Sequence, residues 1–113
     1  MLSAKFRFHS RGGVRYVYRS GKTLRRPGLS LIFCDNTHAK TRFAVVVSKK
    51  VLKSAVARNR VRRRLYEAIR LNFDNFKHQR DYIFVVYDKN LLKLPFSELE
   101  HQLRSLAEAS AIA

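Results

Sequence analysis

The pattern of apolar and polar positions predicts three β-strands. Short runs at 29–33, 43–47 and 82–87 are rich in β-branched and aromatic residues and are bounded by polar or turn-forming residues. Between the first two runs lies Asp35-Asn36-Thr37, a turn-like sequence that favours an antiparallel hairpin. We expect these runs to form one small sheet.

Two longer segments have the 3.6-residue periodicity of helices. The first spans about 54–73, and one apolar stripe runs along it, formed by Ala57, Val61, Leu65, Ala68 and Ile69. The second begins at Ser97, which forms a capping box with Glu100, and continues toward the C-terminus. A short helix at about 14–19 is expected to end at Gly21. This order predicts an α+β fold, a two-layer α/β sandwich with helices packed on a small sheet.

Length and composition favour one domain over residues 1–113. The single cysteine, Cys34, excludes an internal disulfide and favours a reducing compartment. The N-terminus lacks the apolar stretch of a secretion signal, and no apolar run approaches the roughly 20 residues that span a bilayer. We therefore expect a cytoplasmic protein without a membrane partner.

Charge is segregated along the chain. Residues 1–66 hold 18 Lys and Arg and one acid, Asp35, for a net charge of +17, whereas residues 67–113 hold six basic and seven acidic residues. Segregated positive charge on a small folded domain is the electrostatic footprint of a nucleic-acid binder. An anionic membrane is the rival partner, but it requires an amphipathic helix that is free to leave the fold.

The basic residues concentrate around the first long helix. If its apolar stripe faces the core, the opposite face presents Asn59, Arg62, Arg63, Tyr66 and Arg70. Arg58 and Arg60 flank that face, and Arg64 falls near the edge of the stripe. The planar fork of arginine can contact two phosphate oxygens or stack on a base, and an asparagine amide can read a base edge or a ribose hydroxyl.

These residues form a motif that resembles the bacterial ribonuclease P proteins. Arg58-Asn59-Arg60 lies on a helix, follows Val47-Ser48-Lys49-Lys50 at a strand end and precedes Arg62-Arg63. Val17-Tyr18-Arg19 with Gly21 looks like the end of the family's first helix, and Asp81-Tyr82-Ile83 like the start of its last strand. The resemblance covers about residues 7–110.

The resemblance implies a fold and a function. The fold is similar to a ribosomal-protein domain, with a mostly antiparallel sheet and a left-handed βαβ crossover that contains the Arg-Asn-Arg helix. The protein would be a subunit of ribonuclease P, an endonuclease that gives tRNA its mature 5′ end. The catalytic centre and its magnesium ions would lie in an RNA subunit, so no catalytic residue, metal site, cofactor or small-molecule substrate is expected on the protein.

The resemblance also implies two binding sites, one for ribonuclease P RNA and one for the 5′ leader of precursor tRNA. The expected RNA-subunit contacts are Ser48, Lys49, Lys50, Lys53, Arg58, Asn59, Arg60, Arg62, Arg63 and Arg70. The expected leader cleft lies between the first helix and the sheet and contains Val14, Tyr18, Ile32 and Tyr87. Val14 and Ile32 occupy positions that are often aromatic in the family, and Tyr87 replaces a common basic residue. Because side chains alternate along a strand, Phe33 should point away from the cleft.

Two rival functions are compatible with the sequence. An independent nuclease needs its own acid, base or metal ligands, and the basic half offers only Asp35, while the four histidines are scattered without ligand spacing. A structural ribosomal protein is also small, basic and RNA-binding, so composition does not separate it from a ribonuclease P protein. The motif set favours ribonuclease P.

Overall fold

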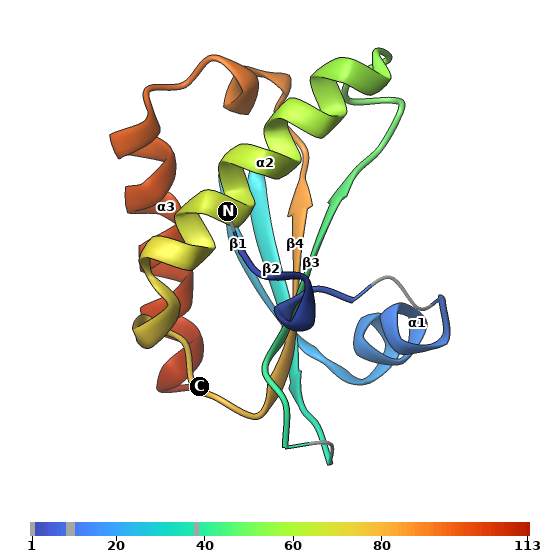
Figure 1. The fold of residues 1–113 in the computed structure, drawn as a ribbon, viewed down its shortest axis with the longest axis vertical. Coiled ribbons are helices and arrows are strands. Elements are labelled where there is room, and N and C mark those ends of the chain that lie inside the picture. Colours follow the sequence, from blue (N-terminus) through green and yellow to red (C-terminus); the bar gives the residue numbers. More distant parts are fainter. Residues whose placement is uncertain (1, 9–10, 38) are drawn as a thin grey trace.

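The computed structural model describes residues 2–8, 11–37 and 39–113. The arrangement is α+β, and the predicted runs and helices all appear. The order is η1 (Ala4–Phe6), α1 (Arg11–Ser20), β1 (Lys22–Arg26), β2 (Leu29–Asp35), β3 (Arg42–Val47), α2 (Ala55–Leu71), η2 (Phe73–Asn75), β4 (Arg80–Val86), η3 (Lys89–Leu92) and α3 (Phe96–Ala111), where η marks a 3-10 helix. Figure 1 shows α1 on one side of the sheet and α2 with α3 on the other.

In the described residues, four strands form one sheet in the order β1-β2-β4-β3. β2 pairs antiparallel with β1 and with β4, whereas β3 pairs parallel with β4. The predicted hairpin between 29–33 and 43–47 is therefore wrong. β4 is buried along its whole length, and its residues 82–86 are apolar on both faces, which suits its central place between β2 and β3.

β1 was not predicted as a defined strand, because its sequence has no apolar alternation. It is an edge strand with mostly exposed positions, and it carries Lys22, Arg25 and Arg26. Charged side chains are a common feature of edge strands because they prevent pairing with another chain. β1 joins β2 through a tight turn at Gly28, whose φ of 78° lies in the left-handed region that glycine adopts freely.

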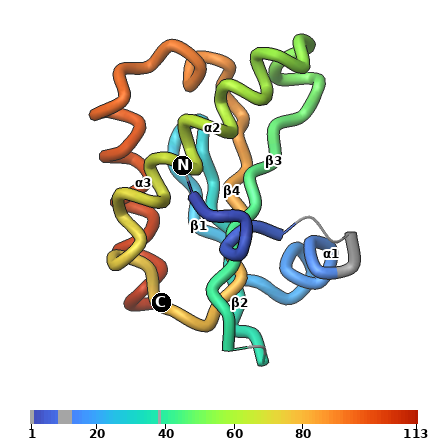
Figure 2. Tube along the Cα trace, in the orientation of Figure 1, coloured from blue at the N-terminus to red at the C-terminus, as the bar shows by residue number. Residues whose placement is uncertain are grey.

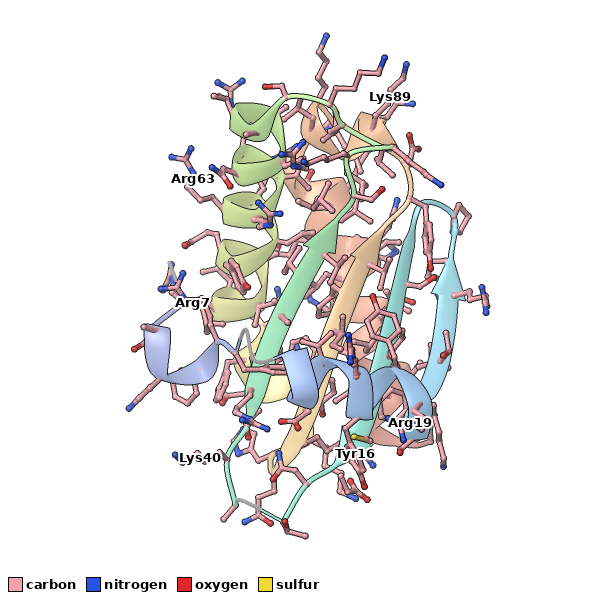
Figure 3. All side chains as sticks on the ribbon, turned by 90° about the vertical axis from the view of Figure 1, so that its right-hand side faces the viewer. Arg7, Tyr16, Arg19, Lys40, Arg63 and Lys89 are labelled. Carbon is pink, nitrogen blue, oxygen red and sulfur yellow. The ribbon has the colours of Figure 1, made fainter. Side chains whose placement is uncertain are left out.

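The connection from β3 through α2 to β4 is left-handed. Figure 3 looks onto the sheet from the α1 side, with β3 to the left of β4 and both strands pointing upward. Seen from the α2 side, β4 lies to the left of β3, which is the left-handed arrangement of a parallel βαβ unit. Nearly all parallel βαβ units are right-handed, so the general rule would have predicted the opposite hand. The left-handed crossover was predicted from the family resemblance alone.

Each face of the sheet has its own apolar cluster. The larger one packs under α2 and α3 and includes Phe33, Phe43, Tyr82 and Phe84. The smaller one packs under α1 and consists of Phe8, Val17, Ile32, Ala44, Ile83 and Val85. Ile32 and Phe33 thus point to opposite faces, as predicted from strand alternation.

The helices begin and end for local reasons. Ser54 caps α2, since its hydroxyl accepts a hydrogen bond from the Ala57 backbone N–H at 3.2 Å. The predicted capping box at Ser97 is wrong, because α3 begins at Phe96 and the Pro95 carbonyl accepts the first hydrogen bonds of the helix. Glu100 instead accepts a hydrogen bond from the Asn72 side chain. α1 ends before Gly21 as predicted.

Candidate nucleic-acid interface

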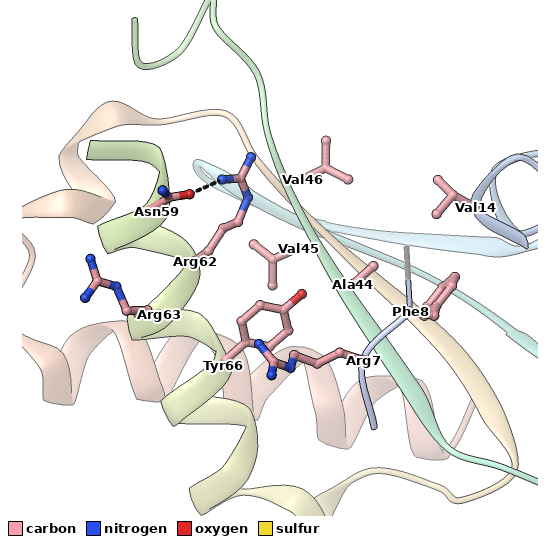
Figure 4. Close-up of a pocket in the computed structure, with 10 residues that line it drawn as sticks. All are labelled: Arg7, Phe8, Val14, Ala44, Val45, Val46, Asn59, Arg62, Arg63 and Tyr66. Atoms are coloured by element: carbon pink, nitrogen blue, oxygen red, sulfur yellow. Dashed lines mark hydrogen bonds between the residues drawn. The ribbon is translucent and has the colours of Figure 1, made fainter. Parts of the chain in front are cut away.

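A groove of about 670 Å³ lies between α1, α2 and the edge strand β3 (Figure 4). α1 packs on β2 and β4, and this leaves the outer part of β3 uncovered on that face. The lining residues are Arg7, Phe8, Val14, Ala44, Val45, Val46, Asn59, Arg62, Arg63 and Tyr66. The groove therefore brings Val14, predicted for the leader cleft, together with three residues predicted to bind the RNA subunit.

The polar side of the groove is cationic. Asn59 Oδ1 accepts a hydrogen bond from Arg62 Nη1 at 2.7 Å, so the two side chains orient each other. Figure 4 shows Arg62 pointing toward β3, while Arg63 points outward from α2. Among the described residues that line the groove, none is Asp or Glu. A cationic groove with an apolar floor suits the backbone and bases of single-stranded nucleic acid.

Arg7 contributes a groove cation that the sequence interpretation missed. Its guanidinium carbon lies 5.4 Å from the centroid of the Tyr66 ring, and its Nε is buried without a hydrogen-bond partner in the described part of the chain. The N-terminal segment crosses β3 in Figure 2, where Phe8 N–H donates to the Phe43 carbonyl at 3.0 Å. This pairing carries Arg7 into the groove, and no local sequence pattern indicated it.

Tyr66 lies on the predicted exposed face of α2 but is buried, with 5% of its surface exposed. The N-terminal segment and the edge of β3 cover it, as the contacts of its ring with Arg7 and of its hydroxyl with the Val45 backbone indicate. Burial raises the pKa of Tyr66, and the hydrogen bond to Val45 opposes that shift. Tyr66 is thus a wall of the groove that supports Arg7.

The other arginines of α2 differ in their surroundings. Arg58 Nη1 donates to the carbonyls of Leu52 and Lys53 at 2.9 and 2.8 Å, so it fastens the loop before the helix. Arg64 donates to backbone carbonyls of the η3 segment, including that of Leu92 at 2.8 Å. Arg60 is exposed. Only Arg62 and Arg63 of the α2 arginines line the groove.

Arg70 lies outside the residues that line the groove and is paired with Glu67 one turn earlier on α2. The Arg70 guanidinium lowers the pKa of Glu67 to about 2. The loop from β3 to α2 exposes Ser48, Lys49, Lys50 and Lys53 beside the start of the helix. The three lysines and Arg60 extend the cationic surface beyond the groove.

The residues predicted for the leader cleft divide into two kinds. Ile32 is 6% exposed and Val14 is half-buried, and both pack in the cluster under α1. Tyr18 on α1 is 45% exposed, and Tyr87 in the loop after β4 is 55% exposed. Burial raises the pKa of Tyr18, and the nearby Tyr87 hydroxyl adds to the shift. Two accessible rings therefore lie near each other.

The family model described as Ribonuclease P matches residues 2–110. The chain belongs to the ribonuclease P protein family. Two similar proteins carry the name ribonuclease P protein component. The protein from Clostridium botulinum (strain 657 / Type Ba4) is 37% identical over 99 residues, which is 87% of each chain. The protein from Pelotomaculum thermopropionicum is 33% identical over 96 residues, covering 85% of this chain and 84% of its own.

Solved ribonuclease P proteins share the fold. The structure from Thermotoga maritima superposes with a TM-score of 0.81 at 22% identity, over 91% of this chain and 96% of that one. The structure from Staphylococcus aureus gives 0.80 at 18% identity, over 93% and 94%. The α+β fold predicted from the resemblance is confirmed.

The described part of the chain contains neither a membrane-spanning helix nor a cluster of metal-ligating side chains. No helix in the described residues combines the length and the apolar character needed to cross a bilayer. Within residues 2–8, 11–37 and 39–113, no three His, Cys, Asp or Glu side chains gather in a way that would hold a metal ion. His9 and His38 lie outside the described residues.

Proposed function

We propose that this ribonuclease P protein is the RNA-binding subunit of an endoribonuclease that removes the 5′ leader of precursor tRNA. The observation that carries the proposal is the groove in which Arg7, Arg62 and Asn59 meet an apolar floor, with no Asp or Glu among its described lining residues. Such a groove attracts phosphates through its cations and accepts bases on its apolar floor.

Ribonuclease P RNA is proposed to bind along the exposed side of α2 and the loop before it. That surface comprises Ser48, Lys49, Lys50, Lys53, Asn59, Arg60, Arg62 and Arg63, with Arg58 supporting the loop. Arg70 is the weakest member of the predicted set, because Glu67 already neutralises it. Exposed cations of this density have few partners in the protein and are free to pair with phosphates.

The 5′ leader is proposed to cross the sheet beside α1, with Val14 and Ile32 as the floor and Tyr18 and Tyr87 as stacking rings. Aromatic rings that hold single-stranded RNA need an accessible face, and these two are about half exposed. Tyr18 lies on α1 and Tyr87 in the loop after β4, so the two rings can stack on adjacent bases.

Hydrolysis is proposed to take place in the RNA subunit, with magnesium bound there. The protein then supplies positive charge and positioning but no catalytic residue, metal or cofactor. Its partners in this proposal are ribonuclease P RNA and precursor tRNA, and it acts in the cytoplasm, as one domain, without a membrane or a small-molecule substrate.

The test is a salt titration of binding between the protein and ribonuclease P RNA. In the Arg62→Ala/Arg63→Ala double variant, the logarithmic salt slope should become shallower by about 0.7 to 0.9 for each phosphate that the protein no longer neutralises. Arg25→Ala is the matched control, because it removes an exposed arginine from β1, at the opposite edge of the sheet from β3, and it should leave the slope unchanged. An unchanged slope in the double variant would refute the proposed interface.

Two further experiments separate this proposal from its rivals, an independent nuclease and a structural ribosomal protein. Purified protein alone should leave precursor tRNA uncut, and addition of the RNA subunit should restore cleavage with a preference for leader-bearing substrates. Affinity purification of the protein should recover one long structured RNA that matures tRNA. Recovery of a ribosomal subunit in its place would assign the protein to the ribosome.

A further inference from the structure

A second pocket, of about 500 Å³, lies at the end of the sheet where β3 begins. Its walls are η1, the segment 39–41 that leads into β3, Phe73 of η2, and His78 and Gln79 before β4. Figure 3 shows Lys40 at the opposite end of the molecule from Lys89. None of its lining residues lines the groove between α1 and α2, so it is a separate site.

Three aromatic rings form one wall of this pocket. The Phe73 ring centroid lies 4.8 Å from that of Phe6 and 5.1 Å from that of His78. Phe6 and Phe73 pack partly against the main core, while His78 is exposed. The rings are tilted by 49° and 36°, so they do not cover one another completely. The wall is therefore anchored in the core and reachable from solvent at His78.

The rim of the pocket is basic. Lys5 and Lys40 are exposed lining residues, and Lys5 Nζ lies 5.0 Å from the centre of the Phe6 ring. Among the described residues that line this pocket, none is Asp or Glu. Aromatic walls with cations at the rim fit a planar base joined to a phosphate, because the base stacks and the phosphate pairs with ammonium groups.

The backbone around the pocket is held in an unusual conformation. Ala39 and Gln79 have φ values of 58° and 64°, and they are the non-glycine residues with positive φ in the described part of the chain. Both line this pocket. The Gln79 N–H donates to Thr41 Oγ1 at 2.9 Å, which ties the two strained segments together. Strained backbone of this kind gathers at binding sites, where the fold fixes a shape in advance of the ligand.

We propose that this pocket binds one unstacked nucleotide of single-stranded RNA, with the base on the Phe73 and His78 rings and the phosphate on Lys5 and Lys40. The inference rests on the proposed function only in taking RNA as the ligand. The RNA subunit and the precursor tRNA both offer this chemistry, and the experiment distinguishes them.

The test measures two dissociation constants, that of the protein for ribonuclease P RNA and that of the holoenzyme for leader-bearing precursor tRNA. A stacked base contributes a factor of about 5 to 150 in affinity, so His78→Ala should raise one of the two constants at least fivefold. His78→Phe keeps a ring and should restore most of the affinity. His101→Ala removes an exposed histidine of α3 and should change neither constant. The constant that rises identifies the RNA that supplies the base.

Lys40→Ala gives an independent readout, because removal of one cation that pairs with a single-stranded phosphate should reduce the salt slope by about 0.7. If His78→Ala melts like wild type and changes neither constant, the pocket binds no nucleotide. If His78→Phe behaves like His78→Ala, stacking is refuted. If His78→Ala changes neither dissociation constant while the Arg62→Ala/Arg63→Ala variant still has a shallower salt slope, this inference alone is overturned. If His78→Ala raises a dissociation constant while the double variant keeps the wild-type slope, the proposed groove is overturned.

Discussion

Arg7 is the groove cation whose replacement is expected to change RNA affinity without a large drop in the free energy of unfolding. In Arg7→Met, the aliphatic stem stays in place while the guanidinium is removed. The interaction with the Tyr66 ring that this change removes is worth about 0.5–2 kcal/mol. Removal of the buried, unpaired Nε recovers about 1–3 kcal/mol of desolvation cost. The two effects oppose each other, so the unfolding free energy of Arg7→Met should lie between about 1 kcal/mol below and about 2.5 kcal/mol above that of wild type.

RNA affinity should respond differently to the same substitution. A hydrogen bond between a guanidinium and a phosphate is worth about 1.5–3 kcal/mol, so the dissociation constant for ribonuclease P RNA or for leader-bearing substrate should rise by roughly 10- to 150-fold. The logarithmic salt slope should decrease by about 0.7–0.9. Arg7→Lys retains the charge but lacks the planar fork, and its affinity should lie between those of wild type and Arg7→Met.

The assays for Arg7 are denaturant unfolding of the protein and RNA binding at several salt concentrations. A drop of several kcal/mol in unfolding free energy, with unchanged affinity in the folded fraction, would make Arg7 a structural residue. Unchanged affinity and unchanged stability together would show that the groove does not hold a phosphate at this position.

Three other predictions concern the core, the leader and the loop before α2. Leu65→Ala should lower the unfolding free energy by about 2–5 kcal/mol, because Leu65 is fully buried. Val56→Ala, at an exposed position, should change the unfolding free energy little, and denaturant titrations measure both variants. Tyr18→Ala should raise the ratio of holoenzyme dissociation constants for leader-bearing over mature tRNA, since stacking on the leader is removed; an unchanged ratio would make Tyr18 a packing residue. Arg58→Ala should reduce both thermal stability and RNA-subunit affinity, because the Arg58 guanidinium donates hydrogen bonds to two loop carbonyls, whereas Arg60→Ala should reduce affinity alone. Calorimetry measures the melting temperatures and filter binding the affinities, and equal melting temperatures of the two variants would contradict the prediction.

Local patterns in the sequence determined the elements of the fold. The apolar stripe of α2 follows from a 3.6-residue period, and Val61, Leu65, Ala68 and Ile69 are all buried as expected. The end of α1 before Gly21 could also be predicted, because glycine is common just after the last turn of a helix. The structure adds that a Cβ at this position would lie 2.6 Å from the Val17 carbonyl oxygen. The exposure of Asn59, Arg60, Arg63 and Arg70 followed from the same geometry. The family resemblance supplied the parallel pairing of the crossover and its hand.

Only the tertiary structure decided which segments became neighbours. A run of β-branched residues favours a strand, but its partner depends on contacts between distant segments, so the turn at 35–37 wrongly suggested pairing between β2 and β3. The same reason explains Tyr66 and Arg7. Helical periodicity placed Tyr66 toward solvent, and nothing near Arg7 in the sequence indicates that the segment before α1 pairs with β3. The groove is made by that long-range pairing, whereas the charges that fill it are already present in the sequence.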